Sequence, residues 1–129
     1  MSVTKRMEEI RNLHQAILIA IQYESKELQP TKTDVAEIPL IFEKFNSVCN
    51  PKYRDNMNIF IFCVFWMYCP MSFVCGKMIY GKVRRATANV LSISSSAVSK
   101  KFVIIKSLIY NHKGFRAEAD RVLELLLAE

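Results

Sequence analysis

Cationic side chains are concentrated in one segment of the sequence, between residues 77 and 116. No aspartate or glutamate occurs from Asn56 to Ala117, whereas nine lysines and arginines do. These are Lys77, Lys82, Arg84, Arg85, Lys100, Lys101, Lys106, Lys113 and Arg116. Such groups attract phosphates, and acidic neighbours would weaken that attraction. The segment therefore predicts a surface that faces a polyanion, the alternative being a chance skew of composition.

Other reactive side chains do not form recognisable sites. The four cysteines are Cys49, Cys63, Cys69 and Cys75; they form no CxxC pair, and both histidines lie far from them in sequence. Zinc ligands usually come as closely spaced pairs, so we expect no metal site and mostly buried, reduced thiols. Glycine-rich phosphate loops and the GxSxG and HExxH motifs are also missing from the sequence. We therefore expect neither an enzyme nor a bound cofactor.

The residues from 86 to 102 fit the pattern of a helical corner. Ala88 is small enough for two helices to touch, Ser92 stands at a turn four residues later, and Val98 can anchor the second helix. Ser94 or Ser95 can cap that second helix, because a serine hydroxyl accepts a hydrogen bond from a backbone amide of the first turn. The spacing therefore predicts a helix-turn-helix.

The window ATANVLSISSSAVSKKF, Ala86–Phe102, resembles the helix-turn-helix of phage Cro and repressor proteins. The resemblance covers about residues 84–103. Three positions depart from the family pattern: Ser92 replaces the usual glycine of the turn, Lys101 occupies an often aliphatic position, and Phe102 takes over that packing role. The resemblance implies double-stranded DNA as the partner.

The resemblance also assigns contacts to individual residues. The positions that lie in the major groove in this family are Ser94, Ser95, Ser96, Ser99 and Lys100. Arg84, Arg85 and Thr87 match positions that contact the DNA backbone in the family, and the basic charge adds phosphate-contacting candidates in Lys77, Lys82, Lys101 and Lys106. Since the groove positions include no Arg, Asn or Gln, we expect modest base discrimination that leans on Lys100 and DNA shape.

The elements that would position these residues are all helices. With 129 residues, 51% of them hydrophobic, and only three glycines and four prolines, the sequence is typical of one globular domain rich in helix. Apolar spacing predicts a long helix over residues 2–28 and a second over 34–48. A third, over 52–68, contains a charge-free run that is typical of a buried core helix. We expect a connector from Met71 to Gly81.

The carboxyl-terminal region completes an all-α fold of five or six helices. Lys113-Gly114 is interpreted as the end of a helix, and an amphipathic helix follows it without any β-hairpin pattern, so no wing is expected. We expect three regions: residues 1–50 for packing or oligomerisation, residues 51–112 as the DNA-binding core, and residues 113–129 as the last helix. The first helix carries a short heptad-like seam, which predicts either packing on its own domain or a homodimer.

The sequence leads to a transcriptional regulator of phage or mobile-element type as the expected function. The main alternative is a non-catalytic protein-interaction adaptor, of sigma-like, replication-initiation or packaging type, with weak DNA contact and a partner held by the terminal helices. A membrane span at Ile59–Cys75 is disfavoured, because the run is short and Pro70 interrupts it. The amino terminus lacks a signal-peptide pattern, so we expect a cytoplasmic protein.

Overall fold

The fold consists entirely of helices in the residues that the computed structural model describes, namely 3–24, 29–75 and 80–128. No strand occurs in these ranges, which confirms the all-α expectation. The helices are α1 (Val3–Glu24), the short 3-10 helix η2 (Val35–Glu37), α2 (Ile38–Val48), α3 (Asn56–Tyr68), α4 (Met71–Cys75), α5 (Gly81–Leu91), α6 (Ser95–Asn111) and α7 (Lys113–Leu127).

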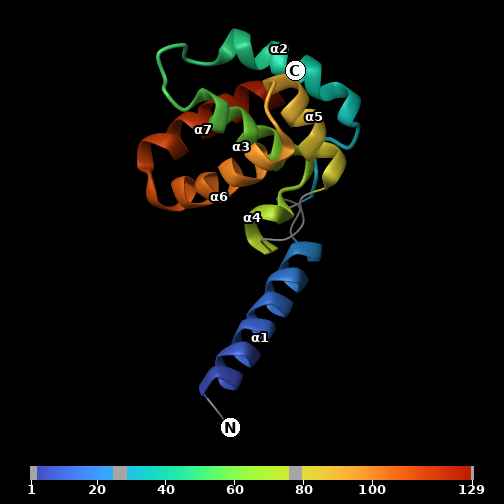
Figure 1. Cartoon of the computed structure of the whole chain (residues 1–129), viewed down its shortest axis with the longest axis vertical. Coiled ribbons are helices and arrows are strands. Elements are labelled where there is room, and N and C mark those ends of the chain that lie inside the picture. The colour runs from blue at the N-terminus through green and yellow to red at the C-terminus, as the bar shows by residue number, and fades with distance from the viewer. Residues whose placement is uncertain (1–2, 25–28, 76–79, 129) are drawn as a thin grey trace.

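Helix α3 is the centre of the molecule, as its charge-free sequence predicts. It packs against α2, α4, α5, α6 and α7, which surround it (Figure 1). Nine of its residues are buried, and Phe60 and Phe65 are fully enclosed. Each fully buried large apolar side chain contributes about 1.5–3 kcal/mol, so α3 supplies much of the stabilisation.

Helix α2 belongs to this same core. Ile38 and Phe45 join the buried cluster, and the Phe45 and Phe60 rings lie 5.2 Å apart between centroids. The ammonium group of Lys44 donates to the Ala128 carbonyl at 2.6 Å, which ties α2 to the end of α7. One buried cluster therefore crosses both expected region boundaries, at residues 50 and 112.

Helix α1 extends away from the helical body, with α4 as its main neighbour (Figure 1). Every side chain from residue 3 to residue 17 is exposed. The large apolar residues of this stretch are Val3, Met7, Ile10, Leu13 and Ile17, each at least 49% exposed. Of the two interpretations of the first helix, packing along its own domain does not apply to residues 3–17.

The described residues form seven α-helices and the 3-10 helix η2, where five or six helices were expected, and two local expectations were also wrong. The segment expected as a connector from Met71 to Gly81 contains the one-turn helix α4 in its first half. Lys113-Gly114 starts α7 rather than ending α6, because His112 breaks the helix there and then caps the next one. Its Nδ1 accepts a hydrogen bond from the Phe115 amide at 2.9 Å, and that cap defines the start of α7.

Candidate nucleic-acid interface

The corner between α5 and α6 is built by the residues that the sequence pattern assigned to it. Ala88 is 3% exposed and Val98 is fully buried. Ser92 ends α5 in the left-handed conformation, at φ 57° and ψ 40°, and is the sole non-glycine residue with positive φ in the described ranges. The Ile93 amide donates back to the Ala88 carbonyl at 3.1 Å, which closes the turn.

Ser94 fixes the start of α6. Its hydroxyl accepts a hydrogen bond from the Ala97 amide at 3.0 Å, as a helix-capping serine does. Of the other expected base-contacting residues, Ser96 and Lys100 are exposed, whereas Ser95 and Ser99 are half-buried. The corner therefore presents its hydroxyl groups and one ammonium group along the amino-terminal half of α6.

Arg84 connects the two helices of the corner. Its Nη1 donates to the Ser99 hydroxyl at 3.1 Å, so both residues are engaged with each other. The Nε of Arg84 is buried and has no hydrogen-bond partner among the described residues. Arg84 is thus a positioning residue as well as a cation.

The remaining phosphate-contacting candidates differ in exposure. Lys82 and Arg85 are exposed on α5, whereas Lys101 and Lys106 are half-buried on α6. The Lys106 ammonium lies 5.2 Å from the centroid of the Phe102 ring, in a cation–π contact.

Two candidates do not contribute to the described surface. Thr87 is fully buried, and its hydroxyl donates to the Val83 carbonyl at 2.7 Å, so the expectation that it contacts a phosphate was wrong. The helical phase of α5 turns this side chain toward the core rather than toward solvent. Lys77 lies outside the described residues.

The cations of the corner are not neutralised by carboxylates. Ion pairs in the described part of the chain join Lys32 to Glu37 and Arg121 to Glu118, and none involves a side chain of α5 or α6. The acid-free sequence from 56 to 117 explains this, since neither α5 nor α6 has an acidic residue to offer. The positive field of this surface therefore reaches solvent.

An apolar strip on the outer face of α6 was not anticipated. Val103, Ile104 and Tyr110 are 64%, 54% and 66% exposed. They follow Lys100 along the same helix, so exposed apolar side chains adjoin the polar amino-terminal half of α6. Val103 and Ile104 lie between the buried residues Phe102 and Ile105, and Tyr110 follows the half-buried Ile109, which gives the sequence signal, because side chains beside a buried stripe face outward.

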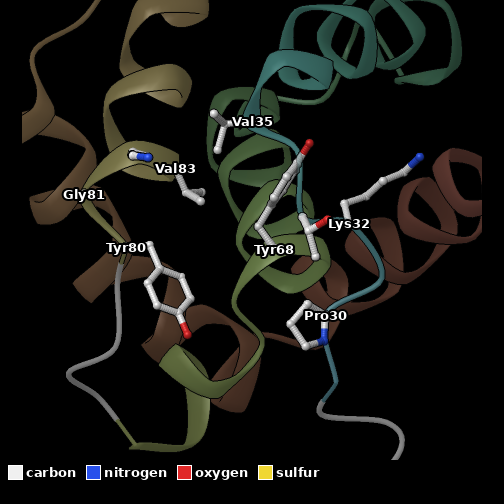
Figure 2. Close-up of a pocket in the computed structure, with 9 residues that line it drawn as sticks. Pro30, Lys32, Val35, Tyr68, Tyr80, Gly81 and Val83 are labelled. Carbon is white, nitrogen blue, oxygen red and sulfur yellow. The ribbon is translucent and has the colours of Figure 1, made fainter.

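A cavity of about 520 Å³ lies beside the start of α5, between that helix and residues 30–35. Figure 2 shows Tyr80 and Val83 on one side of it and Pro30 on the other, with Tyr68 from α3 between them and Val35 above Val83 in this view. Two of the polar side chains here already have partners. Lys32 extends away from Tyr80 and pairs with Glu37 at 3.2 Å, and the Tyr68 hydroxyl donates to the Asp34 carbonyl at 2.7 Å. The wall of the cavity is mostly apolar, and Lys82 at its edge is the lining cation without a carboxylate partner among the described residues.

The described thiols lie in or beside the core, as expected. Cys63 and Cys69 are buried and Cys49 is half-buried, all as free thiols. Burial raises the pKa of both Cys63 and Cys69, which keeps these thiols protonated and unreactive. Within residues 3–24, 29–75 and 80–128, no three His, Cys, Asp or Glu side chains gather as metal ligands would. None of the helices in the same ranges has the length and apolar character to cross a bilayer.

We compared the chain with protein-family models, curated proteins and solved structures. No family model, no curated protein and no solved structure matches it.

Proposed function

We propose that the protein binds double-stranded DNA through the α5–α6 corner and acts as a non-catalytic transcriptional regulator, of the phage or mobile-element type that the motif resembles. The observation that carries the proposal is the combination found at the corner. An exposed row of hydroxyl and ammonium groups starts a helix, and no carboxylate neutralises the cations beside it. Both properties suit a polyanionic groove.

In the proposed complex the amino-terminal half of α6 enters the major groove. Ser96 and Lys100 are the exposed side chains on that half, and Lys100 can donate to the O6 and N7 atoms of guanine. Ser95 and Ser99 stand at the edge of this surface, and Arg84 holds Ser99 in place. Base discrimination rests mainly on Lys100 and on DNA shape.

Phosphate contacts are proposed for the exposed cations of α5, Lys82 and Arg85. The half-buried cations Arg84, Lys101 and Lys106 flank the same surface and add to its field. Thr87 is omitted because it is buried.

A homodimer could bind two halves of a DNA site at once, and helix α1 offers a surface through which two copies can associate. The seam of α1 alternates spacings of four and three residues through Val3, Met7, Ile10, His14 and Ile17, and its side chains are exposed. This heptad spacing is what two identical helices need to pack together. We therefore propose self-pairing through α1, which predicts a two-fold symmetric DNA site with half-sites about 34 Å apart.

A second candidate function is supported by the apolar strip of α6. Val103, Ile104 and Tyr110 expose apolar surface next to the proposed groove helix, and such surface favours a protein partner over a phosphate backbone. The adaptor role therefore remains the alternative proposal, with DNA contact weak or lost and a protein bound at this strip.

A fluorescence-anisotropy titration at several salt concentrations distinguishes these functions. The DNA proposal expects a duplex to bind more tightly than its single strands, with a logarithmic salt slope of about 0.9 per phosphate neutralised. Lys82→Ala and Arg85→Ala should each reduce that slope by about 0.9 on every sequence. Lys100→Ala should weaken the preferred site about tenfold while changing random duplex much less.

Lys52→Ala is the matched control, because it removes the same charge from an exposed turn outside the corner. It should leave the slope unchanged. Equal effects of all four variants on every duplex would contradict the groove assignment. Absence of duplex binding at low salt would favour the adaptor function.

A further inference from the structure

A second cavity lies at the other end of α6, away from the corner. It has a volume of about 430 Å³, within the usual range for small-molecule sites. Residues from α3, α4, α6 and α7 meet there, and all of them belong to the described ranges. They are Phe62, Trp66, Phe73, Ile109, Tyr110, Arg116, Asp120 and Leu123.

Three aromatic rings form one wall of this cavity. Phe62 and Trp66 lie nearly parallel, with centroids 6.1 Å apart and an interplanar angle of 21°. Phe73 stands across them, with its centroid 5.3 Å from that of Phe62 and 5.8 Å from that of Trp66. Phe62 and Phe73 are 5% and 8% exposed and Trp66 is half-buried, so the indole ring is the most accessible ring of this wall, and a ligand ring can stack on it or meet it edge-on. The cavity is thus suited to a planar ring.

Two opposite charges line the same cavity. Arg116 and Asp120 are four residues apart on α7, so they face the same side of that helix. Both are exposed, and within the described ranges neither forms an ion pair, with the other or with a third residue. A guanidinium group donates charge-assisted hydrogen bonds to a carboxylate, and a carboxylate accepts such bonds from an ammonium group. The pair is therefore complementary to a ligand that carries both charges.

We propose that this cavity binds a free aromatic α-amino acid. The ring of the ligand lies against Trp66 and Phe73, its carboxylate faces Arg116, and its ammonium group faces Asp120. The aromatic wall complements the apolar ring of such a ligand, and Arg116 and Asp120 on α7 complement its two neighbouring opposite charges.

Such a ligand would also contact α6. Ile109 and Tyr110 come from that helix, and the Phe73 ring packs against Phe102 of α6 at 5.0 Å between centroids. A ligand held between α6 and α7 restrains the helix that we propose to enter the DNA groove. This regulatory consequence rests on the proposed function, whereas binding of the ligand does not.

Trp66 makes binding directly observable, because it is the single tryptophan of the chain. L-phenylalanine serves as the probe, since it does not absorb where tryptophan is excited selectively. We expect a saturable change of Trp66 fluorescence with L-phenylalanine. Weaker responses are expected from 3-phenylpropionate, which lacks the ammonium group, from phenethylamine, which lacks the carboxylate, and from L-leucine, which lacks the ring.

Variants separate the proposed contacts. Arg116→Gln and Asp120→Asn should each raise the dissociation constant of L-phenylalanine about tenfold, because each removes one charge-assisted contact. Lys113→Gln and Glu124→Gln change exposed charges of the same helix outside the cavity, and should leave it unchanged. Leu123→Phe should fill the cavity and abolish the response, with circular dichroism showing that the fold is retained.

No saturable response of the wild-type protein would overturn the ligand site, as would equal responses to all four compounds. A response that Arg116→Gln and Asp120→Asn leave unchanged would overturn the assignment of the two charges.

The regulatory part is tested by repeating the duplex titration with saturating L-phenylalanine, which should change the DNA dissociation constant at least about threefold. An unchanged constant would overturn the coupling while leaving the site intact, and failure of duplex binding without ligand would count against the proposed function alone.

Discussion

Ser92 shows how a single residue determines the geometry of the corner. The left-handed backbone conformation of Ser92 is about 1–2 kcal/mol less favourable for a residue with a side chain than for glycine. Glycine avoids that cost, but it loses more conformational entropy on folding. We expect Ser92→Gly to raise the free energy of unfolding by about 0.5–1 kcal/mol and Ser92→Val to lower it by more than 1 kcal/mol. Denaturant unfolding measures both.

Ser96→Gly provides the matched control for Ser92. It makes the same change in the first turns of α6, where the backbone is helical, so it should be destabilising. If Ser92→Gly destabilises the protein as much as Ser96→Gly does, strain at the turn is not the controlling factor.

Tyr68 connects the core to the segment before α2. Its hydroxyl donates to the Asp34 carbonyl, and burial together with the charges of Glu37 and Asp34 raises the pKa of Tyr68 to about 12. A raised folded-state pKa favours the protonated form, so this contribution to stability is full below pH 10 and is lost as the pH rises toward 12. Tyr68→Phe should therefore lower the free energy of unfolding at neutral pH. It should also make the decrease of that free energy between pH 10 and 12 smaller.

Chemical denaturation at several alkaline pH values tests this linkage. Tyr110→Phe is the control, because Tyr110 is exposed at 66%. An identical pH profile for wild type and Tyr68→Phe would contradict the assignment.

Among the elements, helix α7 begins where His112 caps it. We expect His112→Ala to lower the free energy of unfolding by about 1 kcal/mol, because the Phe115 amide loses its acceptor. His112→Asn should retain most of the stability, since asparagine is a favoured capping residue. Thermal unfolding measures both, and equal losses for the two variants would show that the ring packs rather than caps.

The sequence predicted long elements better than short ones. Helix α3 was evident because eleven successive side chains from Ile59 to Cys69 lack charge, a pattern compatible only with enclosure or a membrane. Helix α2 was evident from its apolar spacing. Helix α4 was missed because one turn of five residues shows no periodicity, and Lys113-Gly114 was misassigned because glycine near a lysine more often ends a helix.

The candidate site was predictable to a similar degree. The corner residues Ala88, Ser92, Ser94 and Val98 occupy the positions that their spacing predicted, because a turn constrains residue size and capping locally. Thr87 was misplaced because the family pattern gives the order of the residues and not the rotation of α5 on this core. The Arg84–Ser99 hydrogen bond joins two helices and has no local sequence signal.

On the scale of the whole molecule, α1 carries the proposed self-association. Ile10→Glu should place two carboxylates in the seam and convert a dimer into a monomer in sedimentation equilibrium at micromolar concentration. The fold of the body should be unchanged, because Ile10 is 66% exposed. Asn12→Glu is the control, since residue 12 lies on the opposite side of the heptad. A wild-type monomer would remove self-pairing and the symmetric DNA site with it.

The contact between α2 and α7 has a consequence for synthesis of the protein. Lys44 reaches the carbonyl of Ala128 across a sequence separation of 84 residues, and the two helices pack around α3 together. A ribosome therefore exposes the charge-free helix long before α7 exists to cover it. We expect the nascent chain to depend on chaperones that hold apolar segments until translation has passed α7.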